Sequence, residues 1–206
     1  MVRVIAYIDG FNLYFGLRES GYKKYYWLNV RSLAEGLLMF NQELVFTKYF
    51  TSRITDDPDK EKRQTTYIEA LETLRDLNDF EIYYGHYRKD PYQCPHCKCI
   101  YNVPHEKMTD VSIATEMLLD ASNDCFDKAL LISADSDLVP PIKAIRNKYS
   151  EKGIVVAFPP ARYSTDLESV ASASLHINRA KLAQSRFPDK VKKANGFYLQ
   201  RPLEWS

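Results

Sequence analysis

The sequence predicts an α/β domain of three layers, α/β/α, in which a mainly parallel central sheet of about five to six strands lies between helices. Segments typical of strands and of helices alternate along the chain, which is the pattern of a parallel sheet with crossover helices. The 206 residues suffice for one sizeable core and are short for two. Hydrophobic residues make up 45% and charged residues 27% of the chain, so composition gives no reason to expect large-scale disorder.

The first half of the chain opens with an apolar run that Asp9 closes, which predicts a strand over residues 2–9. Two later helices are indicated by apolar residues at helical spacing, namely Leu33, Leu37 and Phe40 in one and Ile68, Leu71, Leu74 and Leu77 in the other. The elements expected after the first strand are a helix over 12–19, a helix over 30–40, a strand over 44–54, a helix that starts near Pro58, and a strand over 80–87.

The second half begins with an irregular, cysteine-bearing segment over 88–105, after which Thr109 is expected to cap a helix over 110–121. A helix over 138–149 accepts Pro140 and Pro141 in its first turn. The other elements expected are a strand over 130–134, a strand over 154–158, a short helix over 164–171 and an edge strand over 175–178. We therefore expect one domain over 1–180 with a cysteine-rich insertion at about 88–106, followed by a basic C-terminal extension over 181–206.

The formal net charge of +1 gives no sign of a strongly basic protein that binds nucleic acid nonspecifically, and an enzyme of nucleic acids needs only local positive charge. The apolar run at the start is too short for a signal peptide and is interrupted by Asp9. No stretch approaches the roughly 20 apolar residues of a membrane span. We therefore expect a cytoplasmic protein without membrane association, in which cysteines stay reduced.

Four aspartates lie where strands should end and where one helix should begin. Asp9 closes the first strand and Asp110 begins the helix over 110–121. Asp135 and Asp137 follow the strand over 130–134. In a parallel sheet the carboxyl ends of strands and the amino ends of helices share one edge, so these side chains can converge. Converging carboxylates need a cation among them, and a cluster of hard oxygen ligands suits Mg²⁺ or Mn²⁺ and the hydrolysis of phosphodiester bonds.

Three short motifs resemble those of a known family. They are Ile8-Asp9-Gly10-Phe11-Asn12, Glu106-Lys107-Met108-Thr109-Asp110-Val111 and Leu131-Ile132-Ser133-Ala134-Asp135-Ser136-Asp137-Leu138. In this order they resemble the motifs of NYN domains, the LabA-like branch of the PIN-like nuclease superfamily, over about residues 2–188. The resemblance implies a PIN-like (Rossmannoid) fold and a Mg²⁺- or Mn²⁺-dependent ribonuclease acting on RNA, most simply single-stranded. It also implies that the catalytic and metal-binding positions are Asp9, Asp110, Asp135 and Asp137.

Other functions stay open beside the ribonuclease. Many NYN domains have no demonstrated substrate, so a noncatalytic RNA-binding or regulatory module is the alternative, and metal-dependent cleavage discriminates the two. A phosphatase of the haloacid dehalogenase type needs a second Asp two positions after the nucleophile, where this chain has Phe11. Glu116 stands where the NYN pattern often has an Asp. Six positions after Asp110 it turns away from that face of the helix, which favours a solvated or salt-bridged residue.

Each acidic residue also has a purely structural interpretation. Asp9 with Gly10 forms a common turn dipeptide, and Asp110 suits the positive end of a helix dipole. Asp135 and Asp137 can cap the next helix. Independent caps need not gather on one edge of a sheet, however, which favours the functional interpretation.

Four further residues are expected to contact substrate: Asn12, Lys107, Ser133 and Arg179. Asn12 either caps the helix that follows it or positions water or phosphate, and Ser133 is otherwise a plain strand residue. Lys107 lies one turn ahead of a helix, where it can neutralise a phosphate, and an ordinary exposed lysine is the alternative. Arg179 opens a run to Lys193 with a local charge of +5, which fits either a phosphate-binding surface or a solvated helix end.

Residues 22–27 combine two lysines with four aromatic side chains. This combination lets bases stack while phosphates are neutralised. The alternative is an aromatic surface packed against the sheet or against a second subunit of a homodimer.

The segment Cys94-Pro95-His96-Cys97-Lys98-Cys99 has the cysteine spacing of a zinc knuckle. We expect Cys94, Cys97 and Cys99 to bind a structural Zn²⁺. His105 is the fourth ligand ranked first, because the loop before it is long enough to fold back, and His96 and His86 are alternatives. Free thiols are the competing interpretation, and Cys125 is expected in the core.

Overall fold

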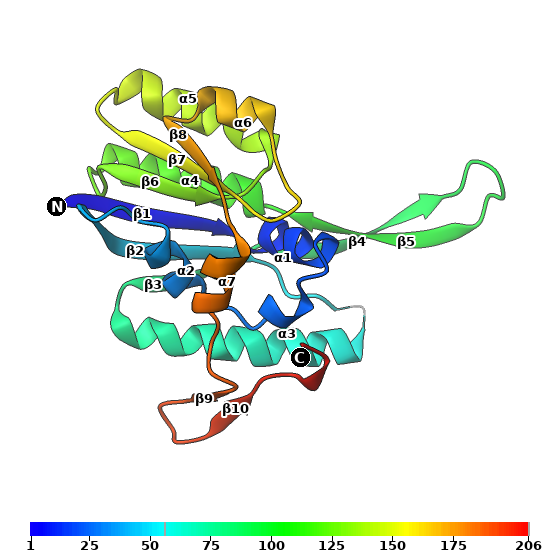
Figure 1. Cartoon of the computed structure of the whole chain (residues 1–206). Coiled ribbons are helices and arrows are strands. Elements are labelled where there is room, and N and C mark those ends of the chain that lie inside the picture. The colour runs from blue at the N-terminus through cyan, green and yellow to red at the C-terminus, as the bar shows by residue number, and fades with distance from the viewer. Residues whose placement is uncertain (56, 206) are drawn as a thin grey trace.

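Six parallel strands form the central sheet of the computed structural model, which describes residues 1–55 and 57–205 and, of residues 87–90 and 101–107, the backbone alone (Figure 1). The order across the sheet is β3-β2-β1-β6-β7-β8. The strands are β1 (Val2–Asp9), β2 (Gln42–Thr51), β3 (Phe80–Tyr84), β6 (Lys128–Ile132), β7 (Gly153–Phe158) and β8 (Ala173–His176). The predicted three-layer α/β class is confirmed.

Both faces of the sheet are buried, as strand β1 shows. Val4, Ala6 and Ile8 belong to one hydrophobic cluster. Ile5 and Tyr7 belong to the other. Because side chains alternate along a strand, a run without polar interruption is what a strand with helices on both faces requires.

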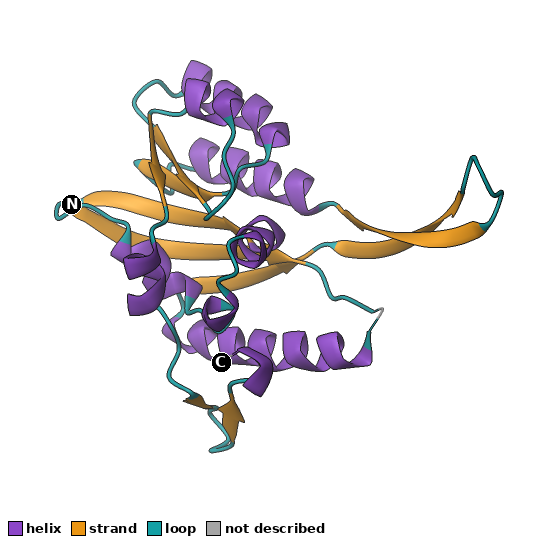
Figure 2. Ribbon diagram, turned by 45° about the vertical axis from the view of Figure 1, so that its right-hand side comes forward, coloured by secondary structure: helices purple, strands orange, loops and turns teal. Residues whose placement is uncertain are grey.

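The first face is covered by helices from the N-terminal half together with one late helix (Figure 2). These are α1 (Gly10–Glu19), α2 (Val30–Gly36), α3 (Pro58–Glu72) and α7 (Arg179–Gln184), with the 3-10 turns η1 (Lys23–Tyr25) and η2 (Thr73–Leu77). Asp57 caps α3 by accepting from the backbone N–H groups of Asp59 and Lys60, and Pro58 takes its first position.

The second face is covered by α4, α5 and α6. Their bounds are α4 (Thr109–Ser122), α5 (Val139–Lys148) and α6 (Thr165–Val170), and the 3-10 turn η3 (Ser136–Leu138) precedes α5. Pro140 and Pro141 lie in the first turn of α5, as the sequence predicts. Ser164 caps α6 by accepting from the backbone N–H of Leu167.

The irregular segment expected over 88–105 is a long antiparallel hairpin, so that expectation is wrong. Its strands are β4 (His86–Gln93) and β5 (Ile100–Lys107), and it projects away from the sheet (Figures 1 and 2). Pro91 and Pro104 stand within it, opposite Asn102 and Lys89. A two-stranded ribbon has only edge strands, which tolerate proline, and this is why a segment with turn-like composition forms strands.

The C-terminal segment packs onto the first face. It contains β9 (Lys190–Lys192), β10 (Tyr198–Gln200) and the 3-10 turn η4 (Leu203–Trp205). Val191, Leu199 and Trp205 are buried in the same cluster as α1 and α2. Trp27 is also buried there, and its Nε1 donates to the carbonyl of Pro188 at 2.8 Å.

Two expected apolar stripes end earlier than their spacing suggests. The helix expected over 30–40 stops at Gly36, and Phe40 is fully exposed. The α3 stripe holds up to Leu74, but the chain tightens into the 3-10 turn η2 and leaves Leu77 exposed. Three residues per turn rotate the side chains out of the 3.6-residue phase, which accounts for the change at Leu77.

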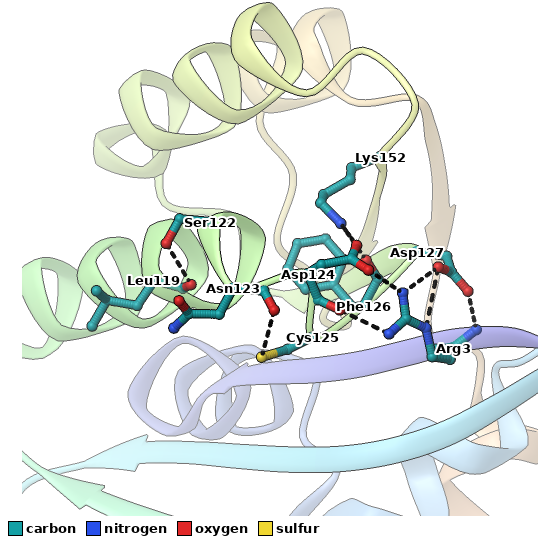
Figure 3. Close-up of polar contacts among 9 residues, drawn as sticks. All are labelled: Arg3, Leu119, Ser122, Asn123, Asp124, Cys125, Phe126, Asp127 and Lys152. Atoms are coloured by element: carbon teal, nitrogen blue, oxygen red, sulfur yellow. Dashed lines mark hydrogen bonds and ion pairs between the residues drawn. The ribbon is translucent and has the colours of Figure 1, made fainter.

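Ion pairs fix the amino edge of the sheet (Figure 3). The Arg3 guanidinium in β1 contacts Asp127 at 2.8 Å and Asp124 at 3.2 Å, both in the loop between α4 and β6. Lys152 joins Asp124 from the other side at 2.6 Å. Cys125 between them is partly buried and packs against the second cluster. The charged residues at this edge therefore hold the structure together.

Within the part of the chain that the structure describes, every helix is too short or too polar to cross a membrane.

Candidate active site at the carboxyl edge of the sheet

The chain reverses its direction across the sheet between β1 and β6. From β1 it runs outward through β2 to β3, then returns to place β6 on the other side of β1. Ile8 pairs with Ile132, so the residues that follow them leave the sheet side by side. Ligands of open α/β sheets bind at such a switch point, outside the carboxyl ends of the strands. The aspartates after β1 and β6 lie there.

Asp9 ends β1 and caps α1. Its Oδ1 accepts from the backbone N–H of Asn12 at 2.9 Å, and its Oδ2 accepts from the Oγ of Ser133 at 2.9 Å. Its side chain is 4% exposed. Burial raises the pKa of Asp9 to about 6 against these hydrogen bonds, and the charges of Asp110 and Asp135 add to the rise. An ionised Asp9 is therefore held in place by the fold but is poorly solvated.

Hydrogen bonds tie the two loops of the switch point together. The Oδ1 of Asn12 accepts from the backbone N–H of Ala134 at 3.0 Å. The Oγ of Ser133 accepts from the N–H of Asp135 at 3.1 Å, and Asp135 in turn caps η3 by accepting from the N–H of Asp137 at 2.9 Å. The positions of Asp9 and Asp135 are thus fixed by hydrogen bonds of Asn12 and Ser133, which lie close to them in the sequence.

Asp110 reaches the same edge from the first turn of α4. The expectation that Thr109 caps this helix is wrong: Met108 occupies the cap with φ of 82° and no side-chain cap bond, and Thr109 is the buried first helical residue. The chain makes this strained turn between β5 and α4, which places Asp110 at the start of the helix. Burial and the charges of Asp135 and Asp137 raise the pKa of Asp110.

A buried ion cluster fastens α4 to the sheet. Lys48 of β2 lies 2.7 Å from Glu116 and 2.6 Å from Asp120. The hydroxyls of Tyr7 and Tyr83 donate to Asp120 and Glu116 at 2.6 and 3.1 Å. Burial favours a neutral lysine, but the two carboxylates outweigh it and raise the pKa of Lys48. Glu116 is thus salt-bridged, as its position in the helix favours, and Asp110 stands on a fixed helix.

The four aspartates fit a hard divalent cation by their chemistry, because they are oxygen ligands whose mutual repulsion a cation relieves. Asp110 and Asp135 lie near enough to act on Asp9 electrostatically. Among the described side chains, however, no three His, Cys, Asp or Glu groups stand close enough together to hold one ion. Asp135 is half-buried and Asp137 is exposed at this edge.

The residues expected to contact substrate fall into different places. Ser133 is fully buried, so it holds Asp9 and does not touch substrate. Asn12 is not the cap of α1, since Asp9 is, and its Oδ1 is used by Ala134. Arg179 is exposed at the start of α7, and its Nε donates to the hydroxyl of Tyr25 at 3.3 Å. The side chain of Lys107 lies outside the described residues.

Cys94, Cys97 and Cys99, the tip cysteines, lie in the turn between β4 and β5. The backbone of Cys94 pairs with that of Cys99, and the N–H of Cys99 and the two neighbouring thiols lower the pKa of Cys97. His105 stands opposite Arg88, five residues along β5 from Ile100. At about 3.3 Å per residue this is roughly 17 Å, so the hairpin register removes His105 from the tip. Its side chain is outside the described residues.

The aromatic-basic stretch, residues 22–27, packs in part against the core of the same chain. Tyr25 and Trp27 are buried in the first cluster, which corresponds to the expected alternative of packing against the sheet. In the basic run Lys193 pairs with Glu69 at 3.1 Å and Arg186 with Asp189 at 3.5 Å, whereas Lys190 and Lys192 are exposed on one side of β9.

The sequence model of the NYN domain matches residues 3–178. The chain belongs to the NYN domain family. This membership places it in the PIN-like nuclease superfamily. The chain is also similar to the 6-hydroxy-3-succinoylpyridine 3-monooxygenase HspA of Pseudomonas putida, at 27% identity over 91% of this chain and 70% of that protein. Among solved structures it is similar to a protein of unknown function, VPA0982 of Vibrio parahaemolyticus, with a TM-score of 0.55 and 21% identity over 86% of this chain and 94% of that one. At that identity the likeness shows the fold alone.

Two features of this NYN domain were missed in the sequence. A lysine within a strand is normally expected on the exposed face. The role of Lys48, an ion pair with Glu116 and Asp120, becomes visible only when α4 is placed against β2. Tyr49 lies under α1: a Cβ added at Gly10 would come within 2.6 Å of its hydroxyl and 2.7 Å of the carbonyl of Phe50. Gly10 therefore lets α1 begin in contact with β2, which no pattern within either segment reveals.

Proposed function

We propose that this NYN domain is a Mg²⁺- or Mn²⁺-dependent ribonuclease that hydrolyses phosphodiester bonds of single-stranded RNA at Asp9, Asp110, Asp135 and Asp137. One observation carries the proposal: aspartates from three separate segments lie at the switch point of the sheet, where burial raises the pKa of Asp9 to about 6 and the charges of Asp110 and Asp135 add to the rise. A fold that needed these residues only as caps has no reason to keep them mutually repulsive.

Each part of the site has a task in this reaction. Asp9, Asp110, Asp135 and Asp137 would hold a divalent cation, which would polarise the phosphate and activate water. Ser133 and the backbone of Asn12 hold the Asp9 oxygens in fixed directions. The amino ends of α1 and α4 lie at this edge, and the positive ends of their helix dipoles favour the negative charge of a phosphate.

Cleavage of single-stranded RNA with Mg²⁺ or Mn²⁺ tests the proposal. EDTA should abolish it, and Asp9→Asn or Asp135→Asn should lower the rate by at least about 10²-fold, the scale of one major electrostatic contribution. Glu43→Gln is the matched control, because Glu43 is an exposed acid of β2 that pairs in register with Arg3 at the opposite edge of the sheet. Equal rates in all variants would identify a contaminating nuclease and overturn the assignment.

A noncatalytic RNA-binding module is the second candidate, favoured by the lack of three ion-binding groups close together among the described side chains. It predicts RNA binding that Asp9→Asn leaves intact, with no cleavage under any metal. The name of HspA describes oxygenation of a pyridine. Incubation of this chain with 6-hydroxy-3-succinoylpyridine is the direct test of whether it shares that substrate.

The proposal includes four broader features. The chain is a member of the LabA-like branch and works in the cytoplasm. The β4–β5 hairpin is an insertion in a domain over 1–180, and residues 181–206 are a basic extension of it.

A further inference from the structure

A pocket of about 500 Å³ adjoins the acidic edge on the first face of the sheet. Its lining comes from α1, η1, the carboxyl end of β2, α3 and η4. Gly10, the residue after Asp9, is part of this lining. Ligand pockets of proteins measure about 300–1,000 Å³, so the space suits a small molecule or one unit of a polymer beside the aspartates.

Aromatic rings form much of the pocket wall. Tyr14 of α1 lies 5.0 Å from Tyr26, measured between ring centroids, and Tyr26 lies 5.8 Å from Trp205 of η4. Tyr67 of α3 follows at 6.0 Å from Trp205. Tyr14 is 38% exposed, so its ring is open to an incoming group. Stacking of a base on one aromatic side chain is worth about 1–3 kcal/mol.

The same lining is rich in positive charge. It contains Arg18, Lys23, Lys60 and Arg63, and among its described residues the one carboxylate is Glu204. Arg63 contacts Glu204 at 3.3 Å and Lys60 contacts Asp57 at 3.1 Å. Arg18 and Lys23 then give the pocket wall its excess of positive charge. Rings together with cations favour a ligand that joins a planar heterocycle to an anion.

We propose that this pocket binds one nucleotide of the RNA substrate, with its base against Tyr14 and Tyr26 and its phosphate near Arg18 and Lys23. The inference rests on the proposed ribonuclease function and adds the place where the unit beside the scissile bond is held. Gly10 lines the pocket and follows Asp9 in the chain, so the pocket and Asp9 adjoin at the start of α1.

Calorimetric titration of the intact chain in EDTA with adenosine 5′-monophosphate tests the pocket without any cleavage. Ribose 5-phosphate, which lacks the base, should bind at least about fivefold more weakly, the lower end of the value of one stacked base. Tyr14→Leu should weaken binding of the nucleotide by the same factor and leave ribose 5-phosphate unchanged. Arg18→Gln should weaken both.

Two controls match these variants. Tyr198→Leu changes an exposed tyrosine of β10, and Lys62→Gln changes an exposed lysine of α3, both outside the pocket lining. Neither should alter binding. Equal nucleotide affinity in Tyr14→Leu and the natural chain would overturn the inference. Tighter binding of nicotinate than of the nucleotide would also overturn it, because the pocket would then serve small heteroaromatic acids.

The same variants separate the pocket from the proposed function. If the chain cleaves RNA and Tyr14→Leu binds the nucleotide as tightly as the natural chain, the pocket proposal is refuted and the ribonuclease proposal is supported. Nucleotide binding that Tyr14→Leu weakens, in a chain that cleaves no RNA, refutes the nuclease and supports the pocket as a nucleotide site.

Discussion

Replacing Asp9 by Asn should stabilise the metal-free protein at neutral pH while it lowers the proposed RNA cleavage. The pKa of Asp9 is raised from 3.8 to about 6 in the folded chain. A rise of about two pKa units corresponds to about 3 kcal/mol, at about 1.36 kcal/mol per unit. The folded state therefore holds its proton more tightly than the unfolded chain, so this contribution to stability is present below pH 3.8 and is lost as pH rises through 6.

The substitution keeps one hydrogen bond and disturbs another. The Oδ1 of Asn can still accept from the N–H of Asn12, but its Nδ2 would donate to the Oγ of Ser133, which already accepts from Asp135. Loss of good geometry there costs about 1 kcal/mol. The expected net gain at pH 7 is about 2 kcal/mol, and for a chain of this size each kcal/mol moves the melting temperature by about 2–4 °C.

Urea unfolding in EDTA between pH 4 and pH 7.5 measures the difference. The free energy of unfolding of Asp9→Asn minus that of the natural chain should rise with pH up to about pH 6 and then level off. Glu43→Gln should show no such step. Added Mg²⁺ should stabilise the natural chain more than Asp9→Asn, because a ligand of the folded state adds its binding free energy. A difference that is flat with pH, or a destabilised Asp9→Asn at pH 7.5, would refute the reasoning.

Three further outcomes are expected. Lys48→Met should cost about 3–5 kcal/mol of unfolding free energy by leaving the buried carboxylates of α4 without their cation, and an unfolding midpoint unchanged in urea would show that the cluster contributes nothing. Lys190→Glu with Lys192→Glu should weaken RNA binding and flatten its salt dependence by close to one unit of slope per lost phosphate contact, leaving cleavage at saturating RNA unchanged; an unaltered slope marks a merely solvated surface. Protein purified without chelator should carry about one zinc per chain at the tip cysteines, lost in Cys97→Ser. No three His, Cys, Asp or Glu groups stand together among the described side chains, so the thiols must come together around the ion when it binds. Elemental analysis that finds no zinc, with all thiols reactive, would leave an ordinary loop.

The fold was predictable where local pattern and tertiary environment agree. The apolar run before Asp9 marks β1 because both its faces are buried, and the same holds for β6 and β7. Hairpin β4–β5 was not predictable, since its prolines and cysteines are typical of loops and its strands pair residues that are 7 (Gln93 and Ile100) to 21 (His86 and Lys107) positions apart. The exposure of Leu77 was not predictable for a different reason. The change from α-helix to 3-10 helix shifts the direction of its side chain, and no local sequence signal marks that change.

The candidate site divides in the same way. The principle that the carboxyl ends of parallel strands share one edge predicted Asp9 and Asp135, because each follows a strand of the sheet. The role of Ser133 could not follow from that rule, since its burial depends on the Oδ2 of Asp9 from another strand. Likewise, the register of β5 separates His105 from the tip, a distance that the number of intervening residues does not fix.

The topology explains why the proposed catalytic site and the proposed nucleotide pocket lie together in this chain. Because β1 is flanked by β6 on one side and β2 on the other, the first turn of α1 borders both neighbours. Asp9 turns its carboxylate toward Ser133 after β6, whereas Gly10 presses against Tyr49 of β2. Strands lie about 4.8 Å apart, so the acidic edge and the aromatic pocket are separated by little more than one strand. A polymer bound as proposed in the pocket would thereby be presented to the aspartates without any movement of the sheet.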